Sequence, residues 1–160
     1  MTLGEIFGEV RKEFGFVPRL IKEMAKSRAV VLVYRNGQKA MASASLSPAD
    51  QQVVQLAVSA INQCDYCRAA HQMGCRLEGI SVSDLEAIQD PGQLPRPSRL
   101  EGLVYATRLV MSKRVLLDTA DLEALQGHGI GRAQLYEIVA LVGLKTISNY
   151  INHIASTRID

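Results

Sequence analysis

Two cysteines and a histidine stand close together within NQCDYCRAAHQMGCR, residues 62–76. Cys64 and Cys67 are three residues apart, and His71 follows four residues after the second cysteine. On a helix these spacings place all three side chains on one face within two turns. A thiolate beside a second thiol can form a disulfide, and a histidine can take up the thiol proton, so this group suits redox chemistry at sulfur.

The start of the helix that carries these residues affects how reactive the thiols are. Asn62 suits the N-cap position, which predicts a helix from about residue 63 to Leu77 with both cysteines in its first turns. Unpaired backbone N–H groups and the helix dipole favour a thiolate there and lower a thiol pKa. We therefore expect Cys67 to attack a peroxide oxygen or an electrophilic sulfur, Cys64 to resolve the product as a disulfide, and His71 to accept the proton.

Other roles for this group stay open at the level of the sequence. A structural zinc site needs converging ligands, but Cys75 stands 11 residues after Cys64, about 16 Å along a helix. Covalent haem attachment needs a histidine directly after the second cysteine, where this chain has Arg68. The thiols could also be ordinary core residues, which is the role we expect for Cys75 and for the packed histidine His153.

The elements that must position these residues are helices. Capping signals, glycines and prolines divide the chain into segments whose apolar residues recur every three or four positions, which predicts an all-α fold in one multi-helix domain, residues 1–160. Helices are expected at residues 3–14, from Pro18, at 27–42, 48–61, 63–77 and 131–155. The stretch SPAD at 47–50 is typical of a helix start, with Ser47 as N-cap and Asp50 at the third helical position.

The expected last helix, from Gly131 to Ala155 with Gly143 interrupting it, is apolar over a wide face. A face this wide belongs either to a helix at the centre of the core or to a helix at a subunit interface, and we predict oligomerising helices and a homo-oligomer on this basis. The residues of this face are Leu135, Ile138, Val139, Val142, Ile147, Tyr150, Ile151 and Ile154.

Composition and charge exclude several classes of function. The chain has 160 residues with 18 basic and 16 acidic side chains interspersed, and a net charge of +2 gives no footprint for nucleic acid. The N-terminus lacks the apolar run of a secretory signal, and no apolar run approaches the roughly 20 residues that cross a bilayer. Three cysteines are too few for a disulfide scaffold, so we expect a cytoplasmic protein without membrane contact.

The sequence LSPADQQVVQLAVSAINQCDYCRAAH, residues 46–71, resembles the core signature of the alkylhydroperoxidase D (AhpD) and carboxymuconolactone decarboxylase superfamily. FGFVPRL at 14–20 and NHIA at 152–155 add weaker similarity, and the diagnostic core covers about 46–77. The resemblance implies an all-α fold, a trimer or hexamer, Cys67 as the peroxidatic thiol, Cys64 as its disulfide partner and His71 in a proton relay. It implies no bound cofactor, with a lipoyl-bearing protein or another dithiol as reductant. The decarboxylase branch lacks the cysteine pair, so CDYC favours the redox branch.

Two positions depart from the AhpD pattern. Gln52 stands where the family has a glutamate of the relay, and Tyr66 stands where well-known members carry a further histidine. Gln52 cannot take up a proton near neutral pH. Asp50, two residues earlier on the same helix, points to roughly the opposite side and cannot replace it. Loss of a general base typically costs 10²- to 10⁴-fold in rate, so weak peroxidase activity is one expectation.

The sequence thus predicts a thiol-dependent peroxidase of the alkylhydroperoxidase type that acts on an organic hydroperoxide or a small disulfide. Two alternatives are a thiol-disulfide oxidoreductase that reduces peroxide poorly because of Gln52, and a redox-responsive protein without turnover. A third, a decarboxylase-like lyase, would need a general acid that the sequence does not identify.

Overall fold

The computed structural model describes residues 1–96 and 98–160, and within these ranges the chain forms nine α-helices, one 3-10 turn and no strand. The all-α prediction is confirmed. The elements are α1 (Leu3–Phe14), α2 (Arg19–Met24), α3 (Arg28–Ala40), η1 (Met41–Ser43), α4 (Pro48–Ile61), α5 (Asp65–Leu77), α6 (Val82–Gln89), α7 (Ser98–Lys113), α8 (Thr119–Gly127) and α9 (Arg132–Ala155).

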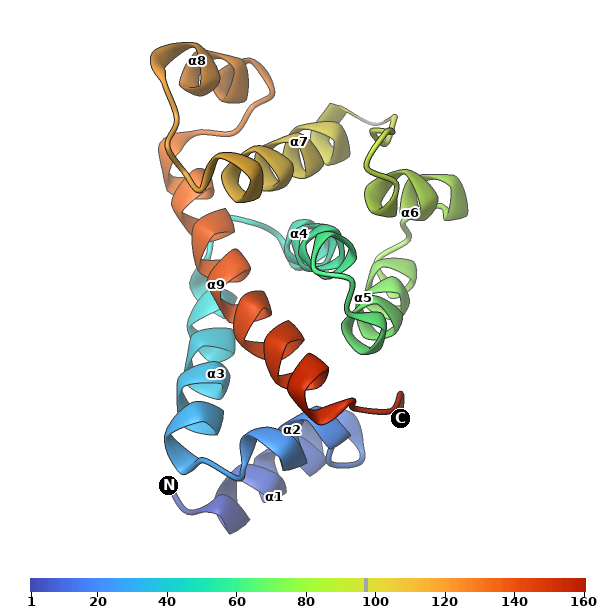
Figure 1. Cartoon of the computed structure of the whole chain (residues 1–160), viewed down its shortest axis with the longest axis vertical. Coiled ribbons are helices and arrows are strands. Elements are labelled where there is room, and N and C mark those ends of the chain that lie inside the picture. Colours follow the sequence, from blue (N-terminus) through green and yellow to red (C-terminus); the bar gives the residue numbers. More distant parts are fainter. Residues whose placement is uncertain (97) are drawn as a thin grey trace.

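Helix α9 runs along most of the length of the molecule, with α1 and α2 at one end and α7 and α8 at the other (Figure 1). Helix α4 lies at the centre and packs against α5, α6, α7 and α9. It can do so because its middle is apolar on most sides, and a helix with little polar surface is stable only when neighbours cover it. Its buried apolar residues are Val53, Val54, Leu56, Ala57 and Val58.

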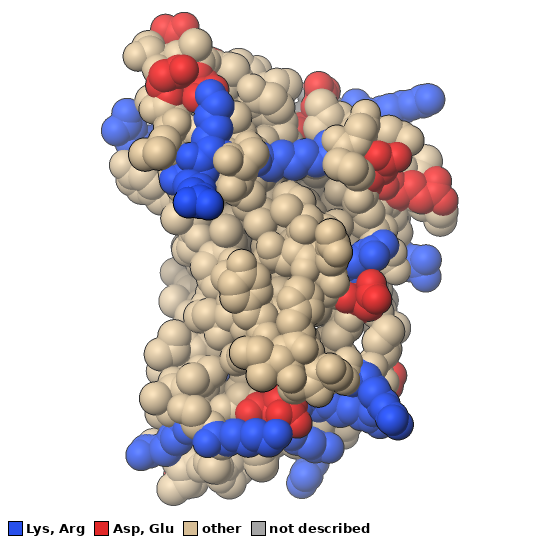
Figure 2. Space-filling view, viewed as in Figure 1, with Lys and Arg blue, Asp and Glu red and all other residues tan. Residues whose placement is uncertain are grey.

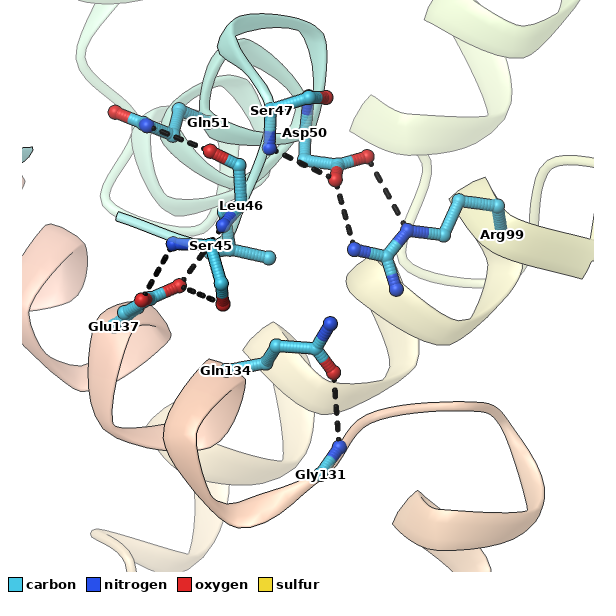
Figure 3. A network of polar contacts seen from close by, with 9 residues as sticks. All are labelled: Ser45, Leu46, Ser47, Asp50, Gln51, Arg99, Gly131, Gln134 and Glu137. Atoms are coloured by element: carbon cyan, nitrogen blue, oxygen red, sulfur yellow. Dashed lines mark hydrogen bonds and ion pairs between the residues drawn. The ribbon is translucent and has the colours of Figure 1, made fainter. Parts of the chain in front are cut away.

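The start of α4 is held by the predicted cap and by two further elements. Ser47 accepts from the Asp50 backbone N–H at 3.1 Å, and Asp50 accepts in return from the Ser47 N–H at 3.2 Å. The same carboxylate pairs with Arg99 of α7 at 2.8 Å. Figure 3 shows this pair and also Glu137 of α9, which accepts from the Ser45 and Leu46 backbone N–H groups. The capping role of Asp50 is as predicted, and its ion pair with Arg99 is a tertiary contact that was not predicted.

The link between α4 and α5 differs from the prediction. Asn62 does not cap the second helix. It ends α4, and its side chain donates to Asn149 Oδ1 of α9 at 3.0 Å. Gln63 then adopts a left-handed conformation with φ 54°, and α5 begins at Asp65 with Cys64 in the N-cap position. The sequence placed the cap two residues early because Asn is a common cap, whereas Asn62 is used here for a contact with a distant helix.

Helix α9 is continuous through Gly143 and turns an unexpected face toward the core. Leu135 and Ile138 are buried as expected, but the buried face continues with polar residues: Lys145, Ser148, Asn149 and Asn152. Several apolar residues of the predicted face point outward instead: Val139, Tyr150 and Ile154, the last 86% exposed. In Figure 2 the middle of the face over α9 carries no charged side chain. No helix in residues 1–96 and 98–160 is both long enough and apolar enough to cross a membrane.

Candidate active site

The two sulfur atoms of Cys64 and Cys67 lie buried at the N-terminal end of α5, where it meets α9. The cysteines are 2% and 1% exposed, and both are free thiols. The Asn152 side-chain amide donates toward both sulfurs, at 3.3 Å from Cys67 Sγ and 3.7 Å from Cys64 Sγ. The Ser148 hydroxyl lies 3.8 Å from Cys67 Sγ. Polar groups of α9 thus surround a pair of thiols that the helix spacing brings together.

The environment makes the two thiols unlike each other. A hydrogen bond from Cys64 lowers the pKa of Cys67 to about 5; desolvation opposes this shift, whereas the positive charge of Lys145 and contacts with Ser148 and Asn149 favour it. The hydrogen bond to Cys67 and burial raise the pKa of Cys64. Cys67 is therefore the more acidic thiol of the pair and Cys64 the less acidic one. This is the division into nucleophile and resolving thiol that thiol redox chemistry requires.

His71 is the middle of a short chain of hydrogen bonds from three helices. Its Nδ1–H donates to Gln52 Oε1 of α4 at 2.9 Å, and its Nε2 accepts from Lys145 Nζ of α9 at 2.7 Å. These roles follow from the partners, because a carbonyl oxygen can only accept and an ammonium can only donate. Burial and the charge of Lys145 lower the pKa of His71 well below its usual value, so the imidazole is neutral. Both of its ring nitrogens are thus engaged by groups other than Cys67.

Lys145, like Ser148 and Asn152, belongs to this candidate site but was not identified from the sequence. Its side chain is 2% exposed, and its ammonium also donates to Tyr34 Oη of α3 at 3.4 Å. A signal was present: Lys145 is the only Lys, Arg, Asp or Glu between Ile138 and Ala155, and it stands seven residues after the buried Ile138. Two turns of helix place the two residues on the same face. A lone lysine on the buried face of a helix marks a group with a specific partner.

Tyr66 lies apart from this chain of hydrogen bonds. Its hydroxyl donates to the Asp160 carboxylate and accepts from the Leu20 backbone N–H at 3.4 Å. Burial, followed by the hydrogen bond with Asp160, raises the pKa of Tyr66. The structure therefore brings Gln52 to His71 but directs Tyr66 toward α2 and the segment after α9, where it joins distant parts of the chain.

The remaining cysteine and histidines lie outside the site. Cys75 is fully buried, and burial raises its pKa to about 12, in keeping with the core role expected for it. His128 ends α8, with its ring 4.8 Å from that of Tyr105. His153 was expected to be packed but is exposed, with Nε2 3.3 Å from the Gln63 carbonyl oxygen. Across the described residues, no three or more His, Cys, Asp or Glu side chains gather as a metal site would require.

Gly74 of α5 leaves the room that Gln52 occupies. A Cβ atom at this position would lie 2.4 Å from Gln52 Oε1. Because the glutamine amide is the flexible end of its side chain, we expect Gly74→Ala to fold, with a change in unfolding free energy within about 1 kcal/mol, since alanine is the better helix former. The amide must leave His71, however, and the ¹⁵N shifts of the imidazole should change in long-range ¹H–¹⁵N spectra.

Gly143→Ala is the matched control for this prediction. Gly143 is also a helical glycine, and a Cβ there meets nothing within 4 Å. This variant should keep the ¹⁵N spectrum of His71. Identical His71 spectra for Gly74→Ala and the unsubstituted protein would contradict the role given to Gly74.

Comparison with known proteins shows a family model that matches the segment carrying this site. Residues 28–92, which contain the two cysteines and His71, match the model of the carboxymuconolactone decarboxylase family. A search of curated protein sequences gave no significant match.

Solved structures share the fold over nearly the whole chain. An uncharacterised peroxidase-related protein with an alkylhydroperoxidase AhpD core, from Ralstonia eutropha JMP134, is 23% identical with a TM-score of 0.86, covering 99% of this chain and 85% of that one. A peroxidase-related protein from Silicibacter sp. TM1040 is 20% identical with a TM-score of 0.83, covering 98% and 84%. The debrominase Bmp8 is 15% identical with a TM-score of 0.73, covering 99% and 86%. The chain therefore has the AhpD-like fold, and its residues 28–92, which carry the cysteine pair, match the carboxymuconolactone decarboxylase family model.

Proposed function

We propose that this protein is a thiol-dependent peroxidase that cycles Cys64 and Cys67 between dithiol and disulfide. The observation that carries the proposal is the unequal pair of buried thiols: Cys67 has a lowered pKa, Cys64 has a raised pKa, and Asn152 donates toward both sulfurs. A peroxidase of this kind needs a thiolate to attack the peroxide and a protonated thiol to complete the disulfide.

The chemistry proceeds in two balanced steps. The Cys67 thiolate attacks the terminal oxygen of an organic hydroperoxide, the O–O bond breaks, and a cysteine sulfenic acid and an alkoxide form. The Cys64 thiol then attacks the sulfenic sulfur, which forms the disulfide and releases water. A dithiol, such as a lipoyl group on a partner protein, would return the pair to the reduced state by thiol-disulfide exchange.

The site offers an acceptor for the substrate hydroxyl. Asn152 Oδ1 is buried and has no hydrogen-bond partner among the described residues, although Nδ2 of the same amide contacts both sulfurs. Buried polar atoms are rarely left unpaired, so this oxygen suits the O–H group of a hydroperoxide whose terminal oxygen approaches Cys67.

Rapid mixing of the reduced protein with one equivalent of cumene hydroperoxide tests the proposal. We expect the Cys64–Cys67 disulfide to form much faster than a free thiol is oxidised at the same pH. Acid quench and intact mass measure how fast the disulfide forms. Dihydrolipoamide should then regenerate the dithiol over many cycles. Oxidation no faster than that of a free thiol would overturn the peroxidase assignment.

A redox-responsive protein without turnover is the second candidate, and the burial of both sulfurs favours it. At 2% and 1% exposure the cysteines offer little access to a large reductant. Turnover separates the two: a sensor would consume one equivalent of hydroperoxide and stop in the presence of dihydrolipoamide, whereas the peroxidase would continue.

We also propose that the chain forms a homo-oligomer, a trimer or hexamer, through the outward face of α9. Tyr136, Tyr150 and Ile154 are exposed on this helix, and the surface around its middle is uncharged in Figure 2. Contiguous exposed apolar surface of this kind is typical of protein interfaces. Sedimentation equilibrium should give a multiple of the monomer mass, and a monomer at all micromolar concentrations would exclude this interface.

A further inference from the structure

Lys145 is a buried ammonium that pairs with no carboxylate of the described residues. None of the ion pairs formed by the described residues includes it. Its contacts are His71 Nε2 at 2.7 Å and Tyr34 Oη at 3.4 Å, both neutral groups. A buried charge is costly unless an opposite charge compensates it. Cys67 is the group of this site whose ionisation would compensate that charge: a hydrogen bond from Cys64 lowers the pKa of Cys67, and the charge of Lys145 adds to this shift.

The backbone of Lys145 lies one side chain away from the sulfur pair. The Ser148 hydroxyl donates to the Lys145 carbonyl oxygen at 3.0 Å and lies 3.8 Å from Cys67 Sγ. Asn152, one turn further along α9, contacts both sulfurs. The lysine, the serine and the asparagine therefore line one face of α9 opposite the thiols.

The peroxide step needs a proton that few groups of this site can supply. Cleavage of the O–O bond leaves an alkoxide, a strong base. Gln52 has no acidic proton, and His71 is neutral with its only N–H bonded to Gln52. The Cys64 proton is required later, for the water released on disulfide formation. The remaining acids that face the site are the Lys145 ammonium and the phenol of Tyr34, and only the ammonium is charged.

We propose that Lys145 is the proton donor of the peroxide step, in place of a carboxylate relay, and that His71 is a positioning residue that holds the ammonium through Nε2. This inference rests on the proposed peroxidase function. The Cys67 thiolate takes the terminal oxygen, and the alkoxide leaves with a proton from Lys145 as an alcohol. Cys64 then supplies its own proton to the hydroxyl of the sulfenic acid as the disulfide forms, and water leaves.

The electrical balance of the buried site supports this assignment. Before oxidation it holds a thiolate and an ammonium. Afterwards it holds a neutral disulfide and a neutral amine, so no unpaired charge is left buried in either state. If the lysine kept its proton, each oxidation would leave an isolated ammonium inside the protein.

Two variants separate proton donation from simple charge. Lys145→Arg keeps the positive charge, but a guanidinium does not release its proton. Lys145→Met removes both the charge and the proton. Lys26→Met, at an exposed lysine, is the control. Each variant is assayed for thiolate absorbance at 240 nm, for alkylation by iodoacetamide, and for oxidation by two oxidants whose leaving groups differ.

The choice of oxidants makes the test specific. Tert-butyl hydroperoxide expels a strongly basic alkoxide, whereas peracetic acid expels acetate, which needs no proton. We expect Lys145→Arg to keep the thiolate and to keep its rates with iodoacetamide and peracetic acid within about threefold. Its rate with tert-butyl hydroperoxide should fall roughly 10²-fold or more, the usual range for a lost general acid. Lys145→Met should also lose thiolate absorbance at neutral pH.

If Lys145→Arg and the unsubstituted protein reacted equally fast with tert-butyl hydroperoxide, the role of Lys145 as proton donor would be overturned, but the peroxidase function would not. A slow reaction of the unsubstituted protein itself would instead overturn the peroxidase function. A measurement on the unsubstituted protein tests the inference even if the variants misfold. In weakly buffered solution with a pH indicator, the kinetic phase in which tert-butyl hydroperoxide oxidises Cys67 should take up no proton from the solvent. Uptake of one proton in that phase would mean that solvent, not Lys145, protonates the alkoxide.

Discussion

Replacing Cys67 by serine is expected to abolish rapid oxidation by cumene hydroperoxide, with a fall in rate constant of roughly 10³-fold or more, because a serine hydroxyl is not ionised near neutral pH and is a poor nucleophile. The variant should fold, since serine is close to cysteine in size and the site already contains polar partners in Asn152 and Ser148. Stopped-flow mixing with quench and intact mass measures the rate directly.

Cys64→Ser should fail at a different point. The first oxidation depends on the Cys67 thiolate and should persist, but no thiol remains to form the disulfide, so the sulfenic acid should accumulate and react with dimedone. Cys75→Ala is the matched control, because Cys75 is buried away from the pair with a raised pKa. If Cys67→Ser were oxidised as fast as the unsubstituted protein while Cys64→Ser were not, the roles of the two cysteines would be reversed.

The second large effect concerns pH. Because the pKa of Cys67 is lowered in the folded state, thiolate absorbance at 240 nm should persist well below the usual thiol range near 8.5 and should be lost only in acid. At pH 7 an unperturbed thiol is a few per cent ionised, whereas Cys67 should be almost fully ionised. Subtracting the titration of Cys67→Ser isolates this signal, and a midpoint near 8.5 would contradict the assignment.

The same shift predicts how stability depends on pH. A folded-state pKa below the unfolded value means that the thiolate stabilises the protein fully above the unfolded pKa. This contribution declines as the pH falls and is absent below the folded pKa. Each unit of difference corresponds to about 1.4 kcal/mol.

His71 also makes the protein less stable as the pH falls below the usual histidine pKa. Its pKa is lowered in the folded state, so the unfolded chain binds the proton more readily. The stability of the unsubstituted protein should therefore fall more steeply than that of Cys67→Ser between pH 8 and 5 in urea unfolding. Parallel curves for the two proteins would show that Cys67 carries no shifted pKa.

Local features of this protein follow from its sequence alone. The spacing of Cys67 and His71 places both on one face of α5, with Cys64 at its N-cap, because helical periodicity depends only on neighbouring residues. The cap formed by Ser47 and Asp50 is equally local, since both hydrogen bonds close within three residues. Recurring apolar positions likewise indicate an all-α fold, which the structure confirms.

The environment of the sulfurs was decided by tertiary structure. Asn152 and Lys145 contact Cys67 and His71 across 85 and 74 residues of chain, and no periodicity connects positions so far apart. The position of the α5 cap depends on a distant helix too, because Asn62 bonds to Asn149 rather than to its own backbone.

The face that α9 buries shows the reason for this division. Sequence patterns assume that apolar residues face inward, yet here Lys145 is inside and Ile154 is 86% exposed. A buried lysine is tolerated only where another element supplies a hydrogen-bond acceptor and a compensating charge. The carboxylate of α9, Glu137, accepts from the Ser45 and Leu46 backbone N–H groups instead and supplies neither to Lys145. His71 and the Cys67 thiolate on α5 provide them, and only the packing of the two helices brings these groups together.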